Sequence, residues 1–158
     1  MQKKGMVWVI GASGGLGRAA AQAFAQNGWS VIAGARSFAE GTSPLGEGVT
    51  VLPLDVTSEE SCAAFVKKAL GMESRVDVLV CAAAQLVLGS CENTTVDELD
   101  RLLNVNVLGT VRMVQRALPL MRRQKGGKMI LFSSINGLLG IPFQSAYTAS
   151  KHALEGYA

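Results

Sequence analysis

The sequence predicts a doubly wound α/β fold, in which helices cover both faces of a parallel β-sheet in three layers. Short apolar runs alternate with helical segments along the 158 residues, and the connections between them are short. The segment Val76–Ala83 is mostly apolar rather than alternating, which is typical of a strand buried on both faces. A glycine-rich turn, Gly11–Gly17, joins the first strand-like run to a helix, as is common in this fold class.

Strands are expected where a short apolar run is bounded by turn residues. The first run ends in the glycine turn, and the second is followed by a loop rich in Gly, Ser and Pro. The five expected strands cover residues 7–10, 31–35, 49–54, 76–83 and 128–132. Because the chain has no repeat, low-complexity tract or long linker, residues 1–158 are expected to form a single domain.

Start and stop signals mark the expected helices. The first covers 16–26 and stops at Asn27-Gly28. Thr57–Glu60 and Thr95–Glu98 are capping-box signatures, which start helices that run to about residue 71 and about residue 124. The longer of these is one helix or two, and Pro119 is expected to kink or loosen its last turns. A last helix is expected from about Ser145, after a loop that contains Pro142.

Composition excludes several classes of function. The net charge of +3, from 15 basic and 12 acidic residues, is too small to indicate nucleic-acid binding. The basic cluster falls toward an expected helix C-terminus, where cations suit the helix dipole. Its members are Arg112, Arg116, Arg122, Arg123, Lys125 and Lys128.

Membrane, secretory and metal signals are weak as well. The longest apolar stretch, 78–88, is too short to cross a bilayer, and the N-terminus lacks the features of a signal peptide. Three cysteines make an odd count without metal-like spacing, so no metal site is expected. They are interpreted as reduced thiols of a cytoplasmic protein, with Cys81 as a buried small apolar residue.

The glycine turn predicts a nucleotide site. Glycine accepts positive φ and lets the backbone approach a ligand, while the following helix N-terminus favours a pyrophosphate. The spacing fits two patterns, G-x-x-x-G-x-G and G-x-x-G-x-x-G, and does not choose between them. The cofactor-binding residues expected in the turn are Gly11, Ser13, Gly14, Gly15, Leu16 and Gly17.

The end of the second strand indicates which nucleotide is bound. An acidic residue there would bind the ribose 2′-hydroxyl of NAD(H), whereas an Arg accommodates the 2′-phosphate of NADP(H). The chain has Ala35 followed by Arg36 at this point, with no carboxylate to repel a phosphate. NADP(H) is therefore the expected cofactor, and NAD(H) remains possible.

Tyr147 and Lys151 predict an acid–base pair. On a helix, residues i and i+4 share one face, so the ammonium can lie beside the phenol. A neighbouring positive charge favours the phenolate and lowers the pKa of a tyrosine toward the working range.

In these motifs the sequence resembles the short-chain dehydrogenase/reductase family, of the shorter-subunit type with a Rossmann-like fold. The resemblance covers the whole chain in order. The matching residues are Gly11, Gly15 and Gly17 of the turn, Asp55-Val56 after the third strand, Asn106 and Gly109 of N-x-x-G, Ser134 after the fifth strand, and Tyr147 and Lys151 of Y-x-x-x-K. The family's spacing before the tyrosine selects Ser134 rather than Ser133.

The resemblance implies an oxidoreductase that interconverts a ketone or aldehyde and an alcohol. Tyr147 would move the proton and Ser134 would hold the substrate oxygen. Lys151 would assist Tyr147 and bind the nicotinamide ribose, while Asn106 would hold a water of the proton relay. Asp55 would meet the adenine. Val56, Ala82 and Ala83 complete the expected cofactor site, and the family implies a homodimer or homotetramer.

Three departures from the family pattern stand out. Ile10 replaces a threonine whose hydroxyl would tie the turn, and Cys81–Ala84 replaces N-N-A-G, which removes bracing asparagine hydrogen bonds. The chain also stops at Ala158, so it is expected to lack the last strands of the family and to leave its fifth strand as an exposed edge.

Alternative functions remain open from the sequence. A catalytically impaired nucleotide-binding fragment or a non-catalytic module would keep the turn without turnover. The longer epimerase/dehydratase type shares Y-x-x-x-K, but the Ser134 and Asn106 motifs favour the first type. The stretches 137–143 and 152–156 resemble the branch that acts on hydroxysteroids and retinoids.

Overall fold

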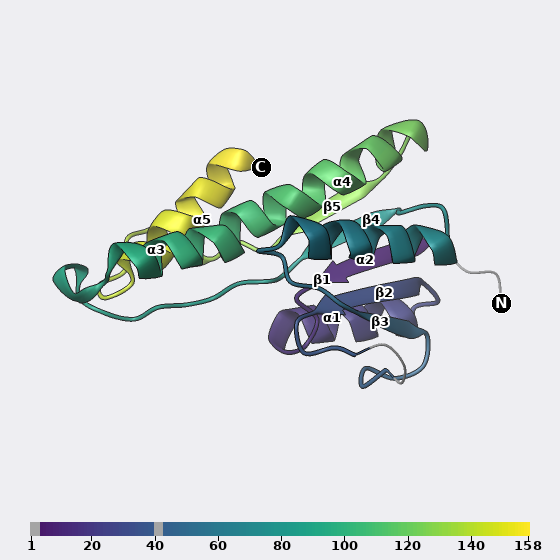
Figure 1. The fold of residues 1–158 in the computed structure, drawn as a ribbon, viewed down its shortest axis with the longest axis horizontal. Coiled ribbons are helices and arrows are strands. Elements are labelled where there is room, and N and C mark those ends of the chain that lie inside the picture. Colours follow the sequence, from purple (N-terminus) through teal and green to yellow (C-terminus); the bar gives the residue numbers. More distant parts are fainter. Residues whose placement is uncertain (1–3, 40–42) are drawn as a thin grey trace.

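The computed structural model describes residues 4–39 and 43–158, and within them a five-stranded parallel sheet (Figure 1). The strands are β1 (Met6–Ile10), β2 (Ser30–Ala35), β3 (Val49–Pro53), β4 (Val78–Cys81) and β5 (Lys128–Leu131). They lie in the order β3-β2-β1-β4-β5, and every pairing is parallel. The strand order reverses next to β1, so the predicted doubly wound sheet is confirmed.

Helices cover both faces of this sheet. The α-helices are α1 (Gly15–Gln26), α2 (Glu59–Met72), α3 (Val96–Leu103), α4 (Gly109–Arg123) and α5 (Ser145–Tyr157). The shorter turns are the 3₁₀ turns η1 (Cys91–Asn93) and η3 (Ile135–Gly137) and the π-helical turn η2 (Asn104–Leu108). In Figure 1, α1 lies on one side of the strands and α2 and α4 lie on the other.

Strand periodicity divides the core into two halves. In β1, Trp8 and Ile10 point toward α2 and α4, whereas Val7 and Val9 point toward α1. All four side chains are almost completely buried. Full burial of one such side chain stabilises the fold by about 1.5–3 kcal/mol. Since β1 buries side chains on both of its faces, it packs against the helical layers on both sides of the sheet and holds them together.

The two predicted capping boxes have different outcomes. At α3 the box is confirmed: Thr95 Oγ1 accepts from Glu98 N, and Glu98 Oε2 accepts from Thr95 N. At α2 the predicted box is wrong, because the N-cap is Ser58, whose Oγ accepts from Ser61 N at 3.1 Å. The Thr57 hydroxyl instead donates to Asp55 Oδ1 at 2.7 Å.

The long helix expected from residue 95 is continuous but not regular. The π turn Asn104–Leu108 lies between α3 and α4, and such turns frequently occur at functional sites. Pro119 lies inside α4, which continues to Arg123. At the far end, Gln124 holds the main chain just before β4, accepting from Val76 N at 3.0 Å and donating to Val76 O at 2.9 Å.

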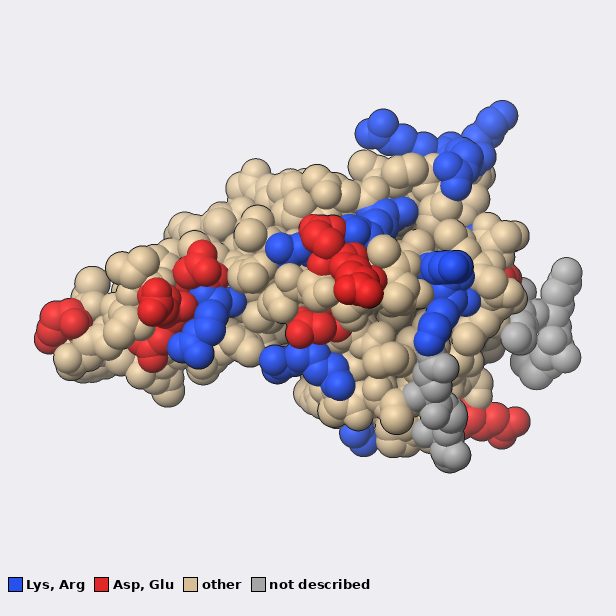
Figure 2. Space-filling view, viewed as in Figure 1, with Lys and Arg blue, Asp and Glu red and all other residues tan. Residues whose placement is uncertain are grey.

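The residues of the basic cluster do not all lie at the C-terminal end of α4. Arg122 and Arg123 occupy the last turn of α4, and Figure 2 shows Lys and Arg side chains gathered over that end of the helix. The expected C-terminal position is wrong for Arg112 and Arg116, because α4 begins only at Gly109. Both of these arginines bind Glu59 of α2.

The remaining surface features concern the edge of the sheet and α5. Among the described strands, β5 is an edge, as predicted, with Ile130 42% exposed. Helix α5 packs against α3 and the π turn, and in Figure 1 α3 and α5 extend together beyond the strands.

No helix in residues 4–39 and 43–158 has the length and apolar character needed to span a bilayer. Clusters of His, Cys, Asp and Glu suited to a metal ion are absent from the same residues.

Candidate functional site

A cleft of about 280 Å³ opens beyond the carboxyl ends of β1 to β4. It brings together eight of the predicted cofactor-binding residues, namely Gly11, Ser13, Gly14, Arg36, Asp55, Val56, Ala82 and Ala83. Ala35, which the sequence places just before Arg36, lines the cleft as well, and the lining residues not predicted from the sequence are Leu54, Ala84, Gln85 and Val105. This is the edge of a doubly wound sheet at which ligands bind.

The structure distinguishes the roles of the glycines. Gly11 has φ +85°, and a Cβ there would lie 2.4 Å from Ala83 N, while Gly15 has φ +52°. A Cβ on Gly17 would lie 2.3 Å from Gly11 O, so this glycine lets α1 pack on the turn. Gly14 is extended and open. A side chain would therefore be strained or would clash at Gly11, Gly15 and Gly17, which are the glycines of the G-x-x-x-G-x-G pattern.

The start of α1 fits a pyrophosphate. Its N-cap, Gly14, has no side chain to accept from the first-turn N–H groups, and such groups favour an anion. The turn is held from the side by Arg18, whose guanidinium donates to Ser13 O at 3.0 Å. Leu16, in the first turn, is 64% exposed and is not part of the cleft lining.

Two charged residues, Asp55 and Arg36, also line the cleft. Asp55 Oδ1 accepts from Thr57 N at 2.9 Å and from Thr57 Oγ1. These bonds, above all the one from the hydroxyl, hold the pKa of Asp55 below its usual range, and the charge of Arg36 acts in the same direction. The exposed Arg36 makes no hydrogen bond or ion pair within the described part of the chain. An ionised carboxylate and an unpaired guanidinium therefore both belong to the lining of the cleft.

Tyr147 and Lys151 lie together on α5, as predicted. Lys151 is only 2% exposed, and its Nζ donates to Phe132 O at 2.7 Å, next to β5. The same nitrogen lies 5.6 Å from the centre of the Tyr147 ring. Burial lowers the pKa of Lys151. The ammonium is thus fixed over the face of the Tyr147 ring.

Asn106 connects the cleft to α5. It is buried in the π turn, where its Oδ1 accepts from Gln85 N at 2.7 Å. Its Nδ2 donates to Gln85 O at 2.9 Å and to Ser150 Oγ at 3.0 Å. Ser150 precedes Lys151, and Gln85 lines the cleft. Both amide hydrogens of Asn106 are already donated. A bound water could therefore interact with this side chain only by donating a hydrogen bond to its Oδ1.

Ser134 begins the 3₁₀ turn after β5, and its surroundings include a residue that the sequence analysis missed. Its Oγ accepts from Asn136 N and donates to Asn136 Oδ1. The buried Asn136 donates in turn to Gln144, the N-cap of α5, and to Thr148 within that helix. The spacing Ser-x-Asn is a local side-chain-to-backbone motif that could have been recognised. Ser133 Oγ is buried without a hydrogen-bond partner within the described residues.

Several known proteins resemble this chain in sequence. Residues 5–158 match the sequence profile described as short chain dehydrogenase. The chain is 37% identical over 153 residues to the 3-ketodihydrosphingosine reductase of Bacteroides thetaiotaomicron, covering 97% of this chain and 55% of that protein. It is 47% identical over 105 residues to the 17-beta-hydroxysteroid dehydrogenase type 1 of Homo sapiens, covering 66% of this chain and 31% of that protein.

A solved structure supports the same relationship. The fold superimposes on a short-chain dehydrogenase from Streptomyces avermitilis with a TM-score of 0.88 and 34% identity, covering 96% of this chain and 57% of that one. The chain thus spans about half the length of the reductase and of this solved structure. Its match to the human dehydrogenase covers 31% of that protein. The profile match over nearly all of its residues shows that this chain belongs to the short-chain dehydrogenase family of oxidoreductases.

Proposed function

We propose that this chain carries the cofactor site and the acid–base residues of an NADP(H)-dependent enzyme that interconverts a ketone or aldehyde and an alcohol. One observation carries the proposal: the buried Lys151 lies beside the Tyr147 ring, on a helix that Asn106 ties to the wall of the cleft. The nicotinamide group would supply or accept the hydride.

The protein residues have distinct roles in this proposal. Tyr147 exchanges a proton with the substrate oxygen. The Ser134 hydroxyl has a single hydrogen, which it would turn from Asn136 Oδ1 to the substrate oxygen in order to hold it. Lys151, held by Phe132 O, keeps a positive charge next to the phenol. Arg36 recognises the 2′-phosphate, and this assignment is supported by its exposed position on the cleft without an ion pair among the described residues.

The substrate proposed is an apolar molecule that carries the reacting oxygen. Leu138, Leu139 and Phe143 follow Ser134 and are more than half exposed. Gly89 N donates to Phe143 O at 2.9 Å, which brings a second loop, with the exposed Leu88, to the same place. Relatives named for a ketodihydrosphingosine and for a hydroxysteroid support this class. A homo-oligomer and a cytoplasmic location stay predictions from the sequence.

A titration of the purified chain with NADPH and with NADH, followed by calorimetry and thermal shift, tests the proposal. Tighter binding of NADPH than of NADH supports the cofactor assignment. Binding of neither nucleotide by a folded chain contradicts it. Binding without turnover of any apolar ketone or alcohol, in this chain and in a longer protein that contains it, would indicate a non-catalytic module.

A further inference from the structure

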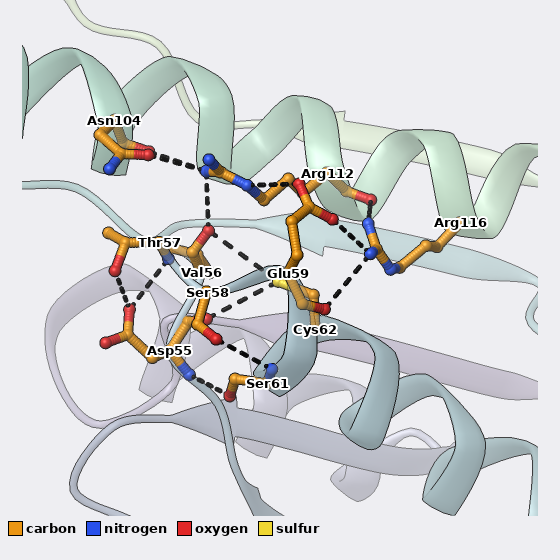
Figure 3. Close-up of polar contacts among 10 residues, drawn as sticks. All are labelled: Asp55, Val56, Thr57, Ser58, Glu59, Ser61, Cys62, Asn104, Arg112 and Arg116. Carbon is orange, nitrogen blue, oxygen red and sulfur yellow. Dashed lines mark hydrogen bonds and ion pairs between the residues drawn. The ribbon is translucent and has the colours of Figure 1, made fainter.

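We propose that Arg112 is a positioning residue that holds two walls of the cofactor cleft at a fixed separation. The inference rests on the proposed function, because the cleft is taken as the nucleotide site. Arg112 does not line the cleft itself. It lies on the first turn of α4, as Figure 3 shows. Its side chain is only 16% exposed.

The guanidinium of Arg112 joins three segments of the chain. Its Nε donates to Glu59 Oε1 at 2.8 Å, at the start of α2. One terminal nitrogen donates to Val56 O at 3.1 Å and to Asn104 Oδ1 at 2.8 Å, and lies 3.5 Å from Asn104 O. Figure 3 shows this side chain lying between the loop after β3 and the π turn. The rigid planar fork of a guanidinium holds several acceptors in fixed directions, whereas a lysine ammonium is a compact charge on a flexible stem.

Both segments that Arg112 holds contribute to the cleft. Val56 lines one wall, and Val105, the neighbour of Asn104, lines another. The Val56 side chain also packs on Gly109, where an added Cβ would lie 2.6 Å from its Cγ2. The loop is thus fixed to α4 by a close contact and by a charge-assisted hydrogen bond.

The same turn connects to the proposed catalytic residues. Asn106 lies in the π turn that begins at Asn104, and it binds Gln85 and Ser150. Movement of this turn would therefore alter the cleft and the support of α5 together.

The ion pair between Arg112 and Glu59 is separate from the bonds to Val56 and Asn104. It contributes little to stability, because the Glu59 side chain is 66% exposed.

Arg116 provides a matched control on the same helix. It is similarly covered, with 23% of its side chain exposed, and it also pairs with Glu59. Its remaining acceptors are Glu59 O and Arg112 O, and it makes no hydrogen bond to Val56 or Asn104 within the described residues. Arg116→Met therefore removes a Glu59 ion pair and leaves the bonds between the cleft walls in place.

The experiment compares Arg112→Met, Arg112→Lys and Arg116→Met with the wild-type chain. The first measurement is amide hydrogen exchange without nucleotide, and the second is the dissociation constant of NADPH. Both Arg112 variants are expected to exchange faster at 55–58 and at 104–109, and to bind NADPH about tenfold more weakly, as expected for the loss of charge-assisted hydrogen bonds. Arg116→Met is expected to change neither measurement.

Several results would overturn the proposal. Equal effects of Arg112→Met and Arg116→Met would mean that only the pairing with Glu59 matters. Wild-type behaviour of Arg112→Lys would mean that charge alone suffices. If Arg112→Met fails to fold, the comparison of Arg112→Lys with Arg116→Met decides the question. A wild-type chain that binds no nucleotide contradicts the proposed function, while the exchange pattern still decides whether Arg112 joins the two segments.

Discussion

Asn106 holds the main chain of Gln85 by both of its hydrogen-bonding groups, accepting from the N–H and donating to the carbonyl. The first bond measures 2.7 Å and the second 2.9 Å. A buried side chain in the π turn thereby fixes the segment that leaves β4 along the cleft. Five predictions follow from this arrangement and from the site around it.

Asn106→Ala should destabilise the fold by about 1–3 kcal/mol, because it leaves buried acceptors and a donor without partners. Gln124→Ala is the control, since Gln124 holds Val76 in the same two-bond manner at the other end of β4. Denaturant unfolding should give similar losses for both variants. Only Asn106→Ala should accelerate amide exchange at Gln85 and weaken nucleotide binding, and equal effects on binding would contradict a local role.

Tyr147→Phe should lower turnover by about 10²–10⁴-fold, the usual contribution of a positioned proton donor. The hydroxyl is removed while the ring beside Lys151 stays, so the dissociation constant of NADPH should change little. Steady-state kinetics and calorimetry provide the two readouts. Retention of most of the wild-type turnover would exclude Tyr147 as the acid–base residue.

Arg36→Ala should weaken NADPH binding by about tenfold to a hundredfold and leave NADH binding nearly unchanged, because only NADPH carries the 2′-phosphate. Arg18→Ala is the comparison: that guanidinium supports the glycine turn through Ser13 O, so any loss of binding it causes should be the same for NADPH and NADH. Competitive titration of both nucleotides measures the preference. A parallel loss for NADPH and NADH would mean that Arg36 supports the cleft without selecting the phosphate.

Gly17→Ala should destabilise the chain by about 1–3 kcal/mol, since the new Cβ would overlap Gly11 O. Gly14→Ala should leave the free energy of unfolding nearly unchanged, because nothing lies within 4 Å of the added atom. As Gly14 lines the cleft, that variant should instead weaken nucleotide binding. Thermal unfolding and titration of the two variants separate packing from ligand contact.

The pH dependence of stability should report the burial of Lys151. Its pKa is lowered in the folded chain, so the unfolded chain binds more protons between that lowered pKa and the unfolded value of about 10.4. The free energy of unfolding of the wild type, relative to Lys151→Met, should therefore rise with pH across this window. Urea unfolding of both proteins at several alkaline pH values measures it, and a difference that is constant or falls with pH would contradict the assignment.

Much of the fold could be predicted because its signals are local. The apolar strands, the glycine turn and the cap formed by Thr95 and Glu98 each depend on residues that are close in sequence. The capping-box pattern predicts a cap for α2 one residue too early. The Thr57 hydroxyl binds Asp55 instead, and a pattern of residue types does not reveal that competition.

The parts of the site that were missed depend on distant contacts. The π turn cannot be recognised from helical periodicity, since the residues that occupy it also suit an α-helix. Gln85 and Val105 carry no motif, and they line the cleft only because β4 and the π turn meet there. Arg112 and Glu59 are likewise far apart in the sequence, so their ion pair could not be predicted from a local pattern.

Asn106 and Gln124, the two residues that hold the segments flanking β4, are joined by one continuous helical run, which begins in the π turn of Asn106 and ends with Gln124 as the C-cap of α4. Each residue added to a helix advances it by about 1.5 Å and turns it by about 100°. A one-residue insertion or deletion within α4 would therefore point one of these side chains away from its partner. Variation in chain length should accordingly be tolerated in the loop before η1 far better than anywhere between these two amides.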